Sequence, residues 1–116
     1  MTIIVAGTVT MEPDKVDAAL EAGIPHVHAA RAEQGCVHYV WSKDPTTPGR
    51  IYVFEEWETQ EDLAAHLQAE PYFNMRDTLG SFGILSADNK KYRVDLSEPV
   101  YDETMTPRAD FFTEGK

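Results

Sequence analysis

Residues 36–57, CVHYVWSKDPTTPGRIYVFEEW, predict a β-hairpin. The first part, from Cys36 to Lys43, and the last seven residues, Ile51 to Trp57, are rich in the β-branched and aromatic residues that favour strands. Between them, residues 44–49 hold two prolines and a glycine, which favour a turn. A loop of about six residues is longer than the tightest hairpin turns, so we expect an open connection.

The segments on either side of the hairpin predict an alternating order of strands and helices. Apolar residues at helical spacing follow Pro13, a favoured first helical residue. Pro25 lies inside this helix and removes a backbone donor, so we expect a kink or short break there. After the hairpin, Thr59 can cap a helix together with Asp62, and we expect Pro71 to stop or bend that helix. The predicted elements outside the hairpin are a strand over 3–10, a helix over 13–31, a helix beginning after residue 59, a second helical piece ending at residue 80, and a strand over 92–96.

This order of elements predicts an α+β fold, the ferredoxin-like split βαβ arrangement, with helices on one face of an antiparallel sheet. Alternation along the third strand separates two sets of side chains, namely Ile51, Val53, Glu55 and Trp57 on one face and Tyr52, Phe54 and Glu56 on the other. Both sets are too apolar for open solvent. We therefore expect a second copy of the chain to cover the free face of the sheet.

Length and charge limit the remaining possibilities. A chain of 116 residues with 42% hydrophobic content can build one core. Its formal net charge of -10 opposes binding to nucleic acid or to an anionic membrane. The sequence lacks a run of about 20 apolar residues and a start typical of a signal peptide, so we expect a cytoplasmic protein. The single cysteine, Cys36, cannot form an intramolecular disulfide.

We expect residues 1–98 to form the domain and residues 99–116 to form an acidic tail. The composition of the tail is typical of a flexible segment. It also contains two adjacent aromatic residues, Phe111 and Phe112. We expect these to pack against a partner subunit.

Several short motifs carry a resemblance to a known family. They are EQGCVHY at 33–39, DP at 44–45, PGR at 48–50, FEEW at 54–57 and AHL at 65–67, followed by Phe73. Over about residues 1–98 the chain resembles the antibiotic biosynthesis monooxygenase family. The resemblance implies a dimeric α/β barrel and, in active members, oxidation of an aromatic quinol or polyketide-like substrate by O2.

The implied chemistry needs no cofactor. An electron-rich phenolate can pass an electron to O2 once the protein has bound, deprotonated and oriented it. In agreement, the sequence has no recognisable nucleotide, flavin or metal motif. The same fold includes haem-degrading enzymes with a helical histidine ligand, but here Asp77 lies near that position, which disfavours haem degradation. A non-catalytic barrel that binds a small hydrophobic ligand, and an isomerase or lyase acting on a polyketide-like substrate, both remain open.

The candidate catalytic residues are His66 and Trp57. His66 lies on a helix face beside Leu63, and an imidazole can exchange a proton near neutral pH. Trp57 matches a tryptophan of the family pocket and could stack on a planar ring. The structural alternatives are a hydrogen-bonded helix histidine and a core aromatic residue.

Four further residues are candidates for binding the substrate: Tyr39, Phe73, Phe82 and Arg76. The three aromatic side chains could equally belong to the core, and Arg76 could pair with a neighbouring acid on its helix. No metal site is predicted, because His26 and His28 are two residues apart and do not share a helix face.

Overall fold

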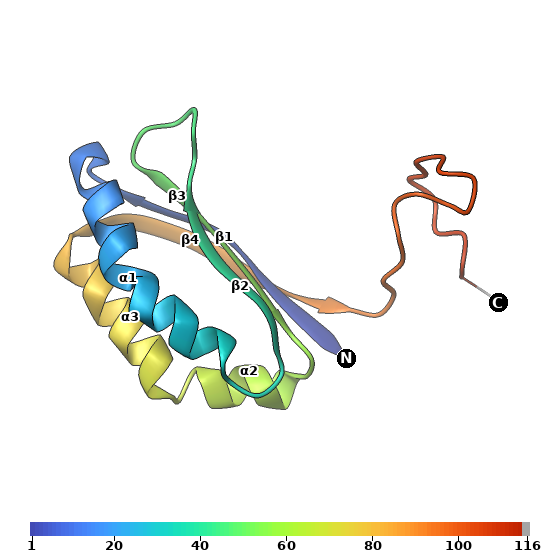
Figure 1. Cartoon of the computed structure of the whole chain (residues 1–116), viewed down its shortest axis with the longest axis horizontal. Coiled ribbons are helices and arrows are strands. Elements are labelled where there is room, and N and C mark those ends of the chain that lie inside the picture. Colours follow the sequence, from blue (N-terminus) through green and yellow to red (C-terminus); the bar gives the residue numbers. More distant parts are fainter. Residues whose placement is uncertain (115–116) are drawn as a thin grey trace.

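The computed structural model describes residues 1–114 as one antiparallel sheet with helices on one of its faces (Figure 1). The elements are β1 (Thr2–Met11), the 3-10 turn η1 (Pro13–Lys15), α1 (Val16–Arg31), β2 (Cys36–Lys43), β3 (Arg50–Trp57), α2 (Gln60–His66), α3 (Glu70–Ser81) and β4 (Ile84–Val94). The strand order is β2-β3-β1-β4, and every neighbouring pair is antiparallel. The predicted ferredoxin-like α+β class is confirmed. None of the described helices has the length and apolar character needed to cross a membrane.

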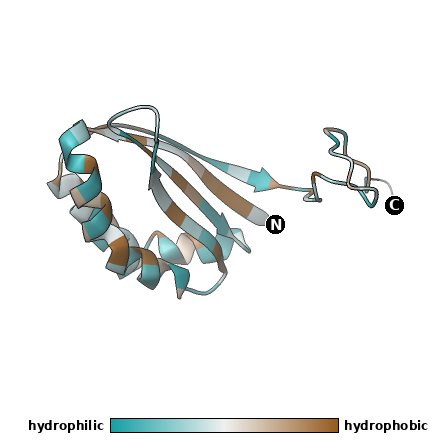
Figure 2. Ribbon diagram, turned by 45° about the horizontal axis from the view of Figure 1, so that its top comes forward, coloured by the Kyte–Doolittle hydropathy of each residue, from teal (hydrophilic) through white to brown (hydrophobic). Residues whose placement is uncertain are grey.

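The hairpin of β2 and β3 forms as the sequence predicts, with residues 44–49 as its loop. Along β3, side chains alternate between buried and more exposed positions, so the set containing Val53 and Trp57 faces the helices. Tyr52 and Phe54 lie on the opposite face and are exposed. Figure 2 shows apolar segments on both the strands and the helices.

The expected break in the first helix is absent, because α1 continues through Pro25. Pro25 is exposed, so water can hydrate the backbone carbonyl that lacks an intrahelical partner. Gly23 has a packing role instead: a Cβ there would lie 3.0 Å from the sulfur of Met75 on α3. Pro71 lies in the first turn of α3, where proline is favoured, and α2 already ends at His66, so Pro71 is not the residue that stops α2.

The last strand is longer than predicted and begins earlier, at Ile84 instead of Tyr92. It pairs with β1 along almost its whole length, from Ile84 opposite Met11 to Val94 opposite Thr2. Nearly all its side chains are exposed, so it lacks the alternation by which a half-buried strand is identified in a sequence.

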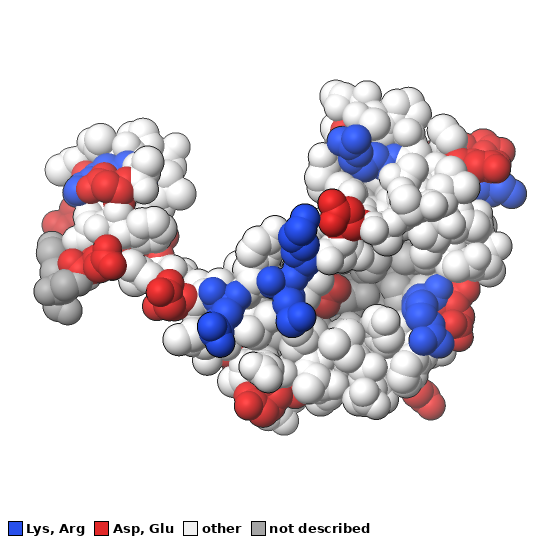
Figure 3. Space-filling view, turned by 180° about the vertical axis from the view of Figure 1, so that it is seen from behind, with Lys and Arg blue, Asp and Glu red and all other residues white. Residues whose placement is uncertain are grey.

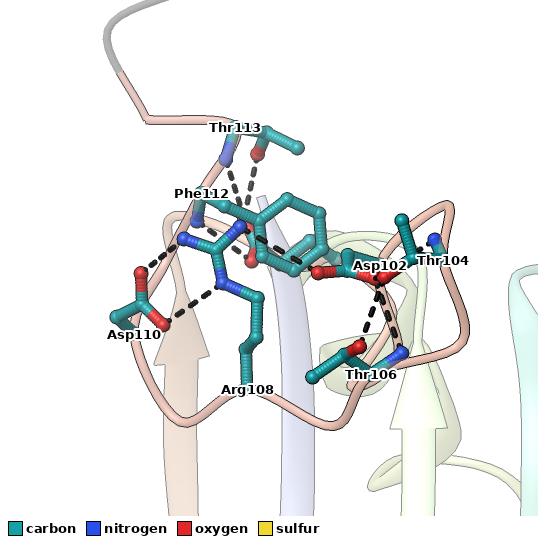
Figure 4. A network of polar contacts seen from close by, with 8 residues as sticks. Asp102, Thr104, Thr106, Arg108, Asp110, Phe112 and Thr113 are labelled. Carbon is teal, nitrogen blue, oxygen red and sulfur yellow. Dashed lines mark hydrogen bonds and ion pairs between the residues drawn. The ribbon is translucent and has the colours of Figure 1, made fainter.

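After β4 the chain leaves the body and forms a separate turn structure (Figure 1). Among the described residues, this turn structure has one isolated β-bridge, between Tyr101 and Pro107. Asp102 accepts hydrogen bonds from the backbone of Thr104 and Thr106, and the Arg108 guanidinium lies 4.8 Å from the centre of the Phe112 ring (Figure 4). Of the tail predicted over 99–116, residues 115 and 116 lie outside the described part.

Candidate functional site

His66 lies at the centre of a buried group of aromatic and acidic side chains. Thr59 caps α2 by accepting a hydrogen bond from the Asp62 backbone, as predicted, and the helix then directs Leu63 and His66 into the core. The His66 side chain is only 1% exposed. Its ring lies 4.6 Å from the Trp57 ring, centre to centre, at an interplanar angle of 30°.

The two nitrogens of His66 face two different carboxylates. Nδ1 lies 2.6 Å from Oε1 of Glu33, in the turn after α1. Nε2 lies 3.9 Å from Oε1 of Glu55, on β3, and this oxygen also accepts a 3.0 Å hydrogen bond from the Trp57 indole. The result is a row of acid, imidazole and acid, with Trp57 holding the second acid in place.

This row does not have the geometry of a metal site. Its two carboxylates approach different ring nitrogens, which point away from each other, so they cannot converge with the imidazole on one ion. Within residues 1–114 no cluster of three metal-binding side chains is found.

Burial changes the acidity of the groups in this row. Glu55 is 8% exposed, and its burial raises the pKa of that carboxyl above its ordinary value of 4.5, although the Trp57 hydrogen bond and His66 partly oppose the rise. Burial also raises the pKa of Tyr39, with the negative charges of Glu55 and Glu33 adding to it. The pKa of the Cys36 thiol is raised mainly by burial as well, which keeps it in its unreactive form.

A cavity of about 440 Å³ lies between the helices and the inner face of the sheet, and Glu55 is on its wall. Most of the surrounding side chains are apolar or aromatic, as is typical of small-molecule sites. The lining includes Val5 and Val9 from β1, Tyr39 and Trp41 from β2, Leu63 and Leu67 around α2, Tyr72, Met75, Arg76 and Leu79 from α3, and residues of β4.

The predicted site residues are only partly brought together. Tyr39 and Arg76 line the cavity. Trp57 is completely buried and lies against His66, so both form a layer behind Glu55. Phe73 packs on Tyr72 and on Arg76, whose guanidinium lies 5.1 Å from the Phe73 ring centre.

Two further contacts complete this description. Arg76 also pairs with Asp77 at 3.2 Å, the kind of surface ion pair considered as its alternative role. Phe82 is partly buried and packs against the hydrophobic core, outside the cavity lining.

Three of the residues around His66 were not among the predicted site residues: Glu55, Glu33 and Tyr72. A signal for Glu55 is present in the sequence, because it is the one charged residue in the set that alternation places on the inner face of β3. Glu33 lies in the turn after α1, where no periodic pattern indicates the direction of its side chain. The contact between Glu33 and His66 joins residues 33 positions apart, which sequence spacing alone does not predict.

Comparisons with known proteins agree with this fold. A family model described as antibiotic biosynthesis monooxygenase matches residues 2–77. An uncharacterized protein of Synechocystis is 32% identical over 72 residues, which are 62% of this chain and 48% of that protein, so the match spans about half the length of the relative.

Solved structures share the same architecture at lower sequence identity. A Deinococcus radiodurans protein, provisionally named an antibiotic biosynthesis monooxygenase, is 21% identical with a TM-score of 0.75, and the match covers 84% of this chain and 96% of that one. A conserved protein of Methanosarcina mazei is 19% identical with a TM-score of 0.72, over 80% of this chain and 92% of that one. At this level of identity the likeness establishes the fold alone.

Proposed function

The chain belongs to the antibiotic biosynthesis monooxygenase family, and on that basis we propose that it oxidises a small aromatic substrate with O2 without a cofactor. The substrate class is a quinol, a phenol or a polyketide-like aromatic compound. One observation carries the proposal: the buried row of Glu33, His66 and Glu55 ends on the wall of a largely apolar cavity of about 440 Å³. An aromatic ring and a proton acceptor can meet there.

Glu55 is the group that touches the substrate in this proposal. It lines the cavity, and because burial raises its pKa it is a stronger base than an exposed carboxylate. His66 lies behind it and passes the proton on toward Glu33. His66 Nε2 and Glu55 Oε1 are 3.9 Å apart, and catalytic hydrogen bonds often shorten when a substrate binds.

The reaction then depends on the substrate's own electrons. Removal of a proton leaves an electron-rich anion that reduces O2, and an oxygenated intermediate forms on the ring. Over the whole reaction the substrate loses two hydrogen atoms and gains one oxygen atom, while the second oxygen atom leaves as water. The apolar cavity walls hold the ring and limit water around the anion.

The test is O2 uptake with a panel of quinols and anthrones, measured against their autoxidation. We expect uptake above background, reduced about 10²-fold or more in His66→Ala and in Glu55→Gln. Glu58→Gln is the matched control, because Glu58 is an exposed carboxylate just beyond β3. If both site variants take up O2 as fast as the wild-type protein, the proposed proton relay is wrong. Absence of uptake with every compound would instead favour the isomerase or the ligand-binding alternative.

We also infer a homodimer. The outer face of the sheet exposes apolar side chains, including Tyr52, Phe54 and Tyr92, which a second sheet would cover. The tail exposes Val100, Tyr101, Met105 and Phe111 away from its own body. Figure 3 shows the tail as a lobe apart from the body, with Lys and Arg side chains on the body near its base.

The charges of the two parts favour contact between copies. β4 contains Lys90, Lys91 and Arg93, while the tail contains Asp102 and Glu103. Sedimentation should therefore give twice the chain mass of 13.0 kDa, and a monomer at micromolar concentration would contradict the dimer. The cytoplasmic location stays a prediction.

A further inference from the structure

One lysine of β4 lies in the same row of the sheet as Glu55. Lys91 is paired with Val5 in the register of β4 and β1, and residues directly opposite each other in a sheet point to the same face. Val5 is in turn opposite Glu55 in the register of β1 and β3. A single row on the inner face therefore runs from Glu55 through Val5 to Lys91, and all three residues line the cavity.

The row has a carboxyl group at one end and an ammonium group at the other. β1 separates β3 from β4, so the backbones of Glu55 and Lys91 are about 10 Å apart, twice the spacing of neighbouring strands. Between them lies the apolar side chain of Val5. An aromatic ring placed over Val5 could therefore have one polar substituent at Glu55 and another at Lys91.

Three cations line the cavity, and Lys91 differs from the other two. Arg76 pairs with Asp77 at 3.2 Å, and Lys90 pairs with Asp88 at 3.3 Å. Within residues 1–114, Lys91 makes no ion pair. Its ammonium group is therefore available to an anionic group of a ligand.

The surroundings of Lys91 do not cancel its charge. The next inner-face residues of β4 in the two directions are Asn89 and Arg93, and neither is negative. Among the described residues that line the cavity, Glu55 is the one carboxyl group, and it lies across Val5. In a chain with a net charge of -10, this end of the cavity is therefore a locally positive place that favours a small anion.

We propose that Lys91 binds an anionic group of the ligand, so that the cavity takes an aromatic acid and holds its ring between Lys91 and Glu55. This inference rests on the proposed function, because it takes the cavity as the substrate site. It narrows the ligand class from aromatic compounds in general to rings that bear an ionised group such as a carboxylate. Hydrogen bonds between charged groups are stronger than neutral ones, so a ring without the ionised group binds less tightly.

The probes are 2-naphthoate, an aromatic carboxylate, and 2-naphthamide, a neutral molecule of nearly the same size and shape. Titration calorimetry measures the binding of both without any oxidation. We expect 2-naphthoate to bind about 10-fold more tightly, near the lower limit for a hydrogen bond between charged groups. Added sodium chloride should weaken the binding of 2-naphthoate and leave that of 2-naphthamide unchanged, because salt screens charges.

Variants test whether Lys91 causes this preference. Lys91→Gln removes the charge and keeps a polar side chain, so it should lower the ratio of the two affinities to about 2 or less by weakening 2-naphthoate. Lys91→Arg keeps the charge and should keep the ratio. Lys43→Gln is the matched control, because it makes the same charge change at an exposed lysine of β2 outside the cavity lining. Ala87→Trp adds a large side chain on the cavity lining, so it should weaken both probes.

Equal affinities for the two probes in the wild-type protein, or a ratio that Lys91→Gln preserves, would overturn the role of Lys91. Binding of 2-naphthoate that Ala87→Trp leaves unchanged would also overturn it, since the anion would then lie outside the cavity. Selective binding of 2-naphthoate without O2 uptake from any quinol would support the role of Lys91 and contradict the oxidation. O2 uptake by a protein that binds both probes equally would do the opposite.

Discussion

Replacing Glu33 tests whether His66 is held by a charged partner. The Nδ1 to Oε1 distance is 2.6 Å, and His66 is almost fully buried, so Glu33→Ala leaves a ring nitrogen without its partner. Hydrogen bonds to charged groups contribute about 1.5–3 kcal/mol net. The Glu33 side chain is 18% exposed, so water can enter the vacated space and replace part of the bond. We therefore expect a loss of about 2 kcal/mol in the free energy of unfolding, from the middle of that range.

The assay is denaturant unfolding at neutral pH, with thermal unfolding as a second measure. A loss of this size corresponds to roughly 8 °C in Tm for a domain of this length. Glu33→Gln keeps the shape and a neutral acceptor, so it should recover about half of the loss, because charge-assisted hydrogen bonds are roughly twice as strong as neutral ones. A loss below about 0.5 kcal/mol in Glu33→Ala would refute the reasoning, since that is the usual effect of a surface substitution.

Three further predictions concern other parts of the molecule. Burial raises the pKa of Glu55 in the folded protein. The contribution of Glu55 to the free energy of unfolding is therefore fully present below the ordinary pKa of 4.5 and is lost as the pH rises through the raised pKa. Glu55→Gln should therefore raise the free energy of unfolding relative to wild type at pH 8 but not at pH 4, and an equal difference at both pH values would contradict this. Gly7→Ala should cost about 2 kcal/mol or more in denaturant unfolding, because its Cβ would collide with the backbone oxygen of Asp88 on β4. The control, Gly80→Ala, has open space and should gain about 0.5–1 kcal/mol, as is typical inside a helix; similar effects of the two variants would contradict the account of Gly7. Removing residues 96–116 should weaken the dimer by about 10-fold or more in sedimentation, and an unchanged dissociation constant would show that the tail does not contact the partner.

The sequence predicts the fold where side chains are patterned by burial. The hairpin, β1 and the first helix each have one face against the core, and their residues follow the periods of a strand or a helix. β4 is an exception, because nearly all its side chains are exposed and do not alternate between buried and exposed positions. The predicted strand over 92–96 leaves out the first eight residues of β4, which are a strand because their backbone pairs with β1.

The site was less predictable than the fold. Alternation places Glu55 on the inner face, but it does not show that the carboxylate meets His66 or accepts from Trp57. Those contacts depend on how α2 packs across the sheet.

The polar composition of β4 has a consequence for how the protein behaves at high concentration. β4 is an edge strand of 11 residues, and a long exposed edge can act as a template on which other chains add strands. Lysines on an edge oppose such growth, and β4 has Lys90 and Lys91 at its centre. Replacing both by valine should therefore lead to fibril formation under conditions in which the wild-type protein stays dispersed. The polar side chains that make this strand hard to recognise in the sequence are thus the ones that protect the protein from aggregation.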